Sequence, residues 1–232
     1  MKKLWMCCVL FLLISSCSPR EATEPPVFTT PVIEGADESD SLDDALVHRL
    51  SVNLGIDESE ISILSSRETE FSDACMDIAL PGVACAQVVT PGRIFILEAD
   101  GLEYEYRTTA SGDSIQPATL ALTWRREGGI AGFCDGLTVY LSGEVYGTNC
   151  RSEPNETSGY FAKLITASEQ KQFNSWFLKY GEINLDISDP EGVSDRMINT
   201  LVFYGSGGGK PNKSEQQVLF DWAIALFQKL NS

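Results

Sequence analysis

The chain contains seven cysteines and a single histidine, and these two counts restrict the chemistry that it can perform. Because His48 is the single histidine of the sequence, no metal site with two histidines can form, and no Ser-His-Asp triad can rest on another imidazole. His48 stands beside Arg49 in a segment with a helical pattern, where we interpret it as a solvated helix residue. The sequence also lacks the His-Glu-x-x-His and Gly-x-Ser-x-Gly motifs. Thiol chemistry is therefore the chemistry about which this sequence is most informative.

The residues before Cys17 are organised as an export signal. Lys2 and Lys3 are followed by an apolar run over 4–14 and two serines, which lead directly to Cys17. A Cys in this place resembles a bacterial lipobox, in which a diacylglyceryl group is added to the thiol and cleavage frees the amine. We expect a mature chain that begins at Cys17 and is anchored by lipid to the bacterial cell membrane, outside the cytoplasm. The alternatives are an ordinary secretory signal and an uncleaved helix, although a membrane span needs about 20 apolar residues.

The other cysteines also divide by compartment, because Cys7 and Cys8 leave with the signal. An even number of cysteines in an exported protein predicts disulfides. Sequence alone does not choose among the pairings, but proximity favours two short loops. A four-cysteine zinc site would need closer spacing within each pair, so we expect no metal there. The four residues concerned are Cys75, Cys85, Cys134 and Cys150, which we expect to pair in that order.

Two further segments invite a ligand interpretation. The glycine-rich run over 205–210 precedes a helical pattern, but Pro211 stands where a phosphate loop needs Ser or Thr. We interpret this run as a strand-to-helix loop. Acidic residues gather in 186–195 and offer the oxygen ligands that calcium prefers, although their spacing is not that of an EF-hand. A turn at Asp189-Pro190 explains them equally well, and the calcium alternative stays open.

The charge balance excludes one class of partner. The chain has 33 acidic and 17 basic side chains and a net charge of −16, and loss of Lys2 and Lys3 with the signal makes it more acidic. Such a chain repels phosphate backbones, so we expect no nucleic-acid binding. A hydrophobic content of 43% is ordinary for a globular protein.

The pattern of residues divides the chain into four parts. A signal peptide (1–16) precedes a Pro- and Thr-rich tether (17–40), which we expect to be disordered. A small α+β domain (41–115) has a helix over 42–54 with Ser41 as its N-cap. Its strands are expected over 60–66, 93–99 and 102–109, the last two joined by an Asp100-Gly101 turn.

A second α+β domain (116–232) begins with alternating apolar residues from Leu120 onward. We expect a hairpin over 137–148, a strand over 160–165, a helix over 166–180, a strand over 200–204 and a terminal helix over 214–230. Thr166 with Glu169, and Ser214 with Gln217, fit the capping box at the starts of the two helices. Hairpins and separate helices together predict an α+β fold of antiparallel sheets with a few packed helices, in two small domains.

The second domain resembles emfourin, a small bacterial protein inhibitor of thermolysin-like metallopeptidases. The resemblance lies in the run Arg126-Glu127-Gly128-Gly129-Ile130-Ala131-Gly132, which is similar to the family's Arg-x-Gly-Gly-Phe-Ala-Gly, with Ile130 in place of Phe. The later order of hairpin, helix, strand and terminal helix is also similar. This resemblance implies an α+β fold and a peptidase partner.

We therefore expect a non-enzymatic, membrane-anchored binding module without a cofactor. The resemblance implies peptidase inhibition, with a thermolysin-like metallopeptidase as its partner. The alternative is an envelope or cell-wall interaction protein without inhibitory activity. The expected partner-binding residues surround the glycine run: Arg125, Arg126, Gly128, Gly129, Ile130, Ala131, Gly132 and Phe133.

Overall fold

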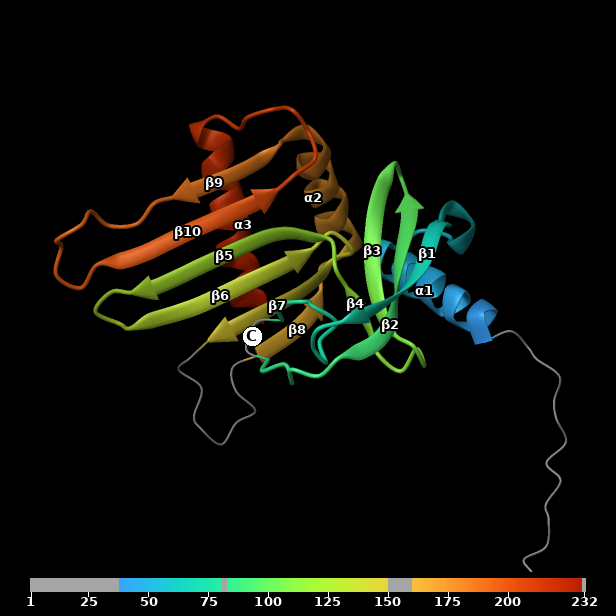
Figure 1. The fold of residues 1–232 in the computed structure, drawn as a ribbon. Helices are drawn as coiled ribbons and strands as arrows, with labels where there is room; N and C mark the ends of the chain where they lie inside the picture. The colour runs from blue at the N-terminus through green and yellow to red at the C-terminus, as the bar shows by residue number, and fades with distance from the viewer. Residues whose placement is uncertain (1–37, 81–82, 150–159, 231–232) are drawn as a thin grey trace, which may run out of the picture. The chain divides into compact units, whose positions relative to one another are not determined.

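The computed structural model describes residues 38–80, 83–149 and 160–230. The signal segment, Cys17, most of the expected tether and Cys150 lie outside these ranges. Within them the chain forms three helices and two antiparallel sheets, one of four strands and one of six (Figure 1). The predicted α+β class is therefore confirmed. None of the helices in the described ranges has the length and apolarity needed to cross a membrane.

The first sheet is formed by the N-terminal half of the described chain, and its strands follow one another in sequence order. Its elements are α1 (Glu38–Leu54), a 3-10 turn (Glu58–Glu60), β1 (Ser62–Phe71), β2 (Thr90–Ala99), β3 (Leu102–Thr109) and β4 (Ile115–Pro117). The predicted Asp100-Gly101 hairpin is confirmed, because both residues have positive φ (52° and 74°) and join β2 to β3. Leu46 and Leu50 of α1 are fully buried in the core.

The start of α1 differs from the prediction. The helix already includes Glu38, so Ser41 lies inside its first turn and is not the N-cap. Residues 38–40 consequently belong to the helix and not to a disordered tether. The acid-rich sequence at this end explains the extension, because negative side chains near a helix N-terminus interact favourably with the helix dipole.

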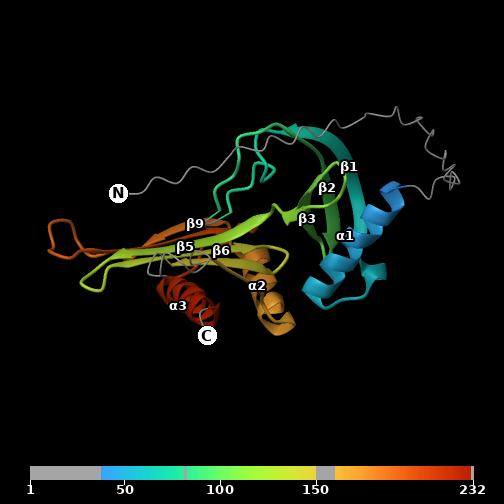
Figure 2. The ribbon, with the colours of Figure 1, turned by 90° about the horizontal axis from the view of Figure 1, so that it is seen from below.

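The second sheet has six strands and is covered on one face by two helices (Figure 2). The strand order is β8-β7-β6-β5-β10-β9, so the pairing of β10 with β5 joins distant parts of the chain. Trp124 of β5 lies opposite Leu201 of β10 and packs on Phe227 of α3, with ring centroids 5.3 Å apart. The elements are β5 (Leu120–Gly128), β6 (Phe133–Tyr140), β7 (Glu144–Asn149), β8 (Tyr160–Leu164), α2 (Ala167–Lys179), β9 (Glu182–Asp186), β10 (Met197–Tyr204) and α3 (Lys213–Leu230).

The two sheets share one core, although each is built from its own part of the chain. The chain passes from one sheet to the other between Pro117 and Leu120, close to the expected boundary at 115–116. The main cluster of buried residues nevertheless includes Phe95 of the four-stranded sheet together with Phe203 of the six-stranded sheet and Phe173 of α2. The described residues accordingly form one compact unit.

The capping box predicted at the start of α2 is confirmed. The Thr166 hydroxyl accepts a hydrogen bond from the backbone N–H of Glu169 (3.3 Å), and the Glu169 carboxylate accepts one from the backbone N–H of Thr166 (2.8 Å). Burial opposes ionisation of Glu169, but hydrogen bonds from Thr166 and Lys229 outweigh it and lower the pKa of this carboxyl. The N-terminus of α2 is thus fixed by residues adjacent in sequence.

The box predicted at the start of α3 was wrong. The N-cap is Asn212, whose Oδ1 accepts hydrogen bonds from the backbone N–H groups of Ser214 (2.9 Å) and Glu215 (3.0 Å). The Glu215 carboxylate in turn accepts one from the backbone N–H of Asn212 (2.8 Å). Ser214 and Gln217 therefore lie within the helix, because Asn caps a helix as well as Ser does and is here followed by Glu at the third position.

We expect Glu215→Gln to lower stability at neutral pH and to lose this effect in acid. A hydrogen bond from Lys179 (2.8 Å) and another from the backbone of Asn212 lower the pKa of Glu215 to about 2, from 4.5. Its contribution is therefore complete above about pH 4.5 and is lost as the pH falls through 2. Urea unfolding at pH 7 and at pH 2.5 measures the difference. Asp44→Asn, on the exposed side of α1, is the control; an equal loss at both pH values would contradict the prediction.

Candidate interaction site

The glycine run singled out in the sequence forms the tip of the β5–β6 hairpin. The two strands pair as far as Gly128 opposite Phe133, and the residues between them make the turn. Three glycines of this turn, Gly128, Gly129 and Gly132, have φ values of 80°, 69° and 61°. Side chains with a Cβ adopt this left-handed conformation only at a cost, so the glycines define the shape of the tip.

Ile130 projects from this tip into solvent. Its exposed fraction is 93%, whereas the other exposed large apolar side chains of the described chain range from 36% to 62%. Ala131 and Gly132 beside it are exposed as well. A single exposed apolar residue is common in proteins, so its neighbours decide whether it marks a surface of interest.

A second loop lies beside the tip and adds apolar surface to it. The backbone N–H of Gly129 donates a hydrogen bond to the carbonyl of Arg196 (3.2 Å), in the loop between β9 and β10. Figure 1 shows both loops at the same end of the six-stranded sheet. We call residues 128–133 and 187–198 the paired tips. Ile187, Val193 and Ile198 in the second tip are 50%, 48% and 36% exposed. Sequence reasoning missed them, although apolar residues in an acidic loop were a visible signal.

Two of the predicted contact residues, Arg126 and Phe133, pack against the strands of the hairpin and are not at its exposed tip. The Arg126 guanidinium is ion-paired with Asp135, with 3.0 Å between Nε and Oδ2, and Asp135 is buried. The guanidinium carbon of Arg126 also lies 3.9 Å from the centroid of the Phe133 ring and 5.5 Å from the centroid of the Trp124 ring. Arg126 and Phe133 are thus partly buried, whereas Arg125 is exposed and pairs with Glu127 on its own strand. The structure brings all eight predicted residues together. Arg125, Ile130, Ala131 and Gly132 are exposed, and the other four are partly buried.

The acidic residues of the second tip shape its backbone. The Ser188 hydroxyl and then its backbone N–H lower the pKa of Asp186, and the backbone bond measures 2.8 Å. Asp189 accepts a hydrogen bond from the backbone N–H of Met197 (2.9 Å), and the Arg196 side chain donates to the carbonyl of Asp189 (2.8 Å). Within the described ranges these carboxylates do not form a group of three close enough to share a metal ion.

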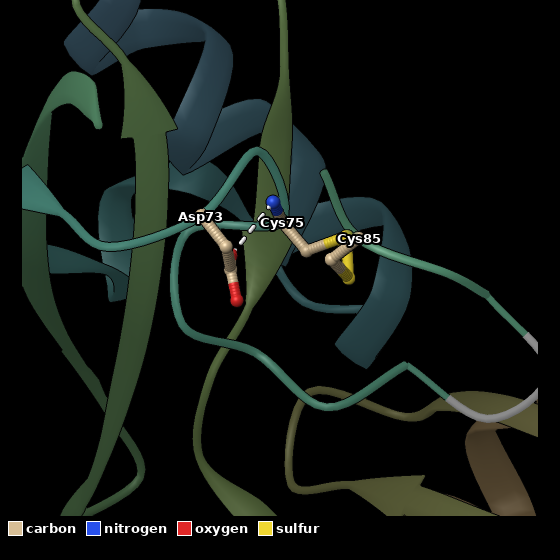
Figure 3. A group of neighbouring side chains, drawn as sticks. All are labelled: Asp73, Cys75 and Cys85. Atoms are coloured by element: carbon tan, nitrogen blue, oxygen red, sulfur yellow. Dashed lines mark hydrogen bonds between the residues drawn. A yellow bond between two sulfur atoms is a disulfide. The ribbon is translucent and has the colours of Figure 1, made fainter. Parts of the chain in front are cut away.

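The first predicted disulfide is present. The Sγ atoms of Cys75 and Cys85 are bonded at 2.05 Å, with Cα atoms 5.5 Å apart, in the segment between β1 and β2 (Figure 3). The Asp73 carboxylate accepts a hydrogen bond from the backbone N–H of Cys75 (2.9 Å) and lies close to both sulfurs. These three are the potential metal ligands that the described residues bring together, but sulfurs joined to each other are not thiolates, the form that binds metals.

The second predicted disulfide involves Cys134 and Cys150. Cys134 is disulfide-bonded. Cys150 lies outside the described residues, so this pairing stays a prediction.

The glycine-rich run joins β10 to α3, as predicted, and its backbone also closes the C-terminal end of α2. The backbone N–H groups of Ser206 and Gly207 donate to the carbonyl of Phe177, at 2.9 and 3.3 Å, and Gly209 donates to that of Lys179 at 3.0 Å. A Cβ on Gly207 would lie 2.3 Å from the carbonyl oxygen of Leu178. Glycine is therefore required here by close backbone packing against the end of a helix, where carbonyls otherwise lack partners.

Part of the chain matches a model of a known protein family. Residues 44–117 match a family model described as a domain of unknown function (DUF8738). This stretch corresponds to most of α1 and the whole four-stranded sheet, and it ends with β4. No curated protein and no solved structure matches the chain significantly. The paired tips lie in the part of the chain beyond this domain of unknown function.

Proposed function

We propose that this protein is a lipid-anchored, extracytoplasmic binding protein whose paired tips dock into a groove of a partner protein. The exposure of Ile130 at 93%, on a turn shaped by glycines, is the observation that carries the proposal. The lipobox pattern at Cys17 supports the location. The resemblance to emfourin makes a thermolysin-like metallopeptidase the first partner to test, with inhibition as the consequence of docking.

The tip is suited to docking because it is ordered before it meets a partner. Arg126 bridges Asp135 and the Phe133 ring behind it, and Gly129 is hydrogen-bonded to the second tip. A loop already held in one conformation loses less entropy on binding than a flexible one. Transfer of an isoleucine side chain from water into an apolar pocket contributes about 1.5–3 kcal/mol. The neighbouring apolar residues of the second tip enlarge the surface that a partner can cover.

We expect Ile130→Asp to weaken inhibition of thermolysin at least about tenfold, because about 1.4 kcal/mol of lost binding free energy is a factor of ten. The test uses the full chain carrying Cys17→Ser, which removes the lipid site but no part of the described fold. Residual peptidase activity is titrated against inhibitor concentration. Val88→Asp is the matched control, because Val88 is also an exposed apolar residue (54%) but lies outside the paired tips.

Equal inhibition by the Ile130 and Val88 variants would remove the tip from the proposal. No inhibition by the parent chain, of thermolysin or of a panel of other secreted peptidases, would contradict the inhibitor function. In that case an envelope or cell-wall component becomes the partner to seek, with the same pair of variants as the readout in envelope pull-downs.

A further inference from the structure

A second candidate site lies outside the paired tips, where α1 meets α2. It is a cleft of about 490 Å³ lined by the C-terminal end of α1, the turn between β2 and β3, and one side of α2. This volume lies within the range of small-molecule sites, about 300–1,000 Å³. The apolar part of the wall comes from all three elements: Leu54, Ile56, Leu102 and Leu178.

The ends of the two helices meet at this cleft. A Cβ on Gly55 would lie 3.3 Å from the Cβ of Ala167, so α1 ends against the beginning of α2. Gly55 has a φ of 69° and directly follows α1, at the position where glycine commonly ends a helix. The walls of the cleft thus belong to elements of the same compact unit, which gives it a fixed form.

Two opposite charges line the same cleft. Lys171 is exposed on α2, and Asp100 is exposed in the β2–β3 turn. Among the described residues neither side chain forms an ion pair, whereas Lys179 and Lys229 do. A ligand with both a negative and a positive group therefore finds a complement for each.

A buried polar group lies behind this surface. The Tyr104 hydroxyl is buried and has no hydrogen-bond partner within the described ranges. Burial raises the pKa of Tyr104, and the neighbouring Asn174 side chain partly opposes this shift. Asn174 lines the cleft and accepts a hydrogen bond from Gln170 through its Oδ1 (2.7 Å). Its side chain has two N–H donors and a second lone pair on Oδ1, so it can still offer a polar group to a ligand.

We propose that this cleft binds an apolar amino acid or a short apolar peptide in zwitterionic form, with the carboxylate toward Lys171 and the amine toward Asp100. The apolar side chain of the ligand lies against the leucine-rich wall. A fatty acid fits less well, because it has no positive group for Asp100 and meets a strongly acidic protein. A nucleotide is disfavoured because its phosphates would meet a strongly acidic protein. In the described chain the cleft offers them a single cation, Lys171.

The proposal predicts a defined ligand preference, measured by isothermal titration calorimetry on the full chain carrying Cys17→Ser. L-leucine and leucyl-leucine bind, whereas N-acetyl-leucine, leucine amide and octanoate, which each lack one charge, bind at least about five- to tenfold more weakly. Lys171→Met and Asp100→Asn each weaken leucine binding by a similar factor. Asparagine retains the turn, because it tolerates positive φ.

Three controls separate this site from folding defects and from the proposed inhibitor function. Lys210→Met removes a lysine outside the cleft and leaves leucine affinity unchanged. Ser175→Trp, on the exposed side of α2, blocks the cleft and abolishes binding while the circular dichroism spectrum is retained. Ile130→Asp leaves leucine binding unchanged, so failure at one site does not count against the other.

Two results would overturn the proposal. One is the absence of heat or thermal stabilisation with leucine and leucyl-leucine up to millimolar concentrations. The other is equal affinity for the ligands that lack a charge, or binding of octanoate alone, which would assign the cleft to an acyl chain.

Discussion

Replacement of Arg49 by methionine is expected to destabilise the folded protein by about 3–5 kcal/mol, because it leaves a buried carboxylate without its counter-ion. Glu144 has an exposed side-chain fraction of only 9% and accepts hydrogen bonds from Nε (2.9 Å) and Nη2 of Arg49. The Ser142 hydroxyl also donates to this carboxylate. The third nitrogen of Arg49 donates to the carbonyl of Ile115 (2.8 Å), so one side chain of α1 is hydrogen-bonded to two other elements, β4 and β7.

A second variant distinguishes loss of the ion pair from loss of packing. In the double variant Arg49→Met with Glu144→Gln, no unpaired charge is buried, so we expect recovery of a large part of the lost stability. Arg93→Met is the control, since its partner Glu68 is 84% exposed and such pairs contribute about 0–1 kcal/mol. Urea unfolding followed by tryptophan fluorescence and circular dichroism measures all four proteins. Equal losses for Arg49→Met and Arg93→Met would contradict the argument.

This ion pair also bears on the extent of the domain of unknown function. Arg49 on α1 and Ile115 on β4 lie within the matched stretch 44–117, whereas Glu144 lies in the six-stranded sheet. Arg49 further lies 5.7 Å from the ring centroid of the buried Tyr106. The matched stretch consequently completes its polar contacts and its core with residues from the rest of the chain.

The features predicted correctly from sequence are those whose signals are local. Asp100 and Gly101 form their hairpin because the two turn residues alone fix the backbone geometry. Thr166 and Glu169 satisfy each other's backbone groups three residues apart. The helices α2 and α3 could also be predicted from the sequence, because the apolar positions that face the core recur every three or four residues.

The features that were missed depend on distant pairing. β9 contains just two apolar residues, Ile183 and Leu185, and it becomes a strand because it lies beside β10. β4 is three residues long and likewise exists through its pairing with β3. A three-residue strand offers no periodic pattern, whereas the polar–apolar alternation of β9 was a local strand signal that was overlooked. The start of α3 was missed for another reason, since two overlapping capping patterns were available and Asn212 was overlooked.

The candidate site shows the same division. Resemblance located the glycine run, and exposure of Ile130 follows from its position at a turn. The role of Arg126 could not be read from sequence, because its partner Asp135 lies on the opposite strand. The position of the second tip beside the first could not be predicted either. The contact between Gly129 and Arg196 follows from the pairing of β5 with β10, and no local sequence pattern indicates that pairing.

Gly128→Ala is expected to destabilise the protein by about 2–4 kcal/mol and to weaken partner binding together with it. Two costs combine at this position. A φ of 80° is unfavourable for alanine, and its Cβ would lie 2.3 Å from the carbonyl oxygen of Arg196, which belongs to rigid backbone. Either the strand end or the second tip must therefore move, so the two tips separate.

Gly132→Ala isolates the first of these costs. Gly132 also has a positive φ (61°), but a Cβ there meets nothing within 4 Å. We expect a loss of about 1 kcal/mol for this variant, from backbone strain alone. The additional loss in Gly128→Ala, measured by urea unfolding, reports the contact between the tips, and the inhibition assay reports its consequence for docking. If both variants lost the same stability and Gly128→Ala bound its partner as the parent does, the second tip would have no part in holding the first, and Ile130 would act from a hairpin that is ordered by itself.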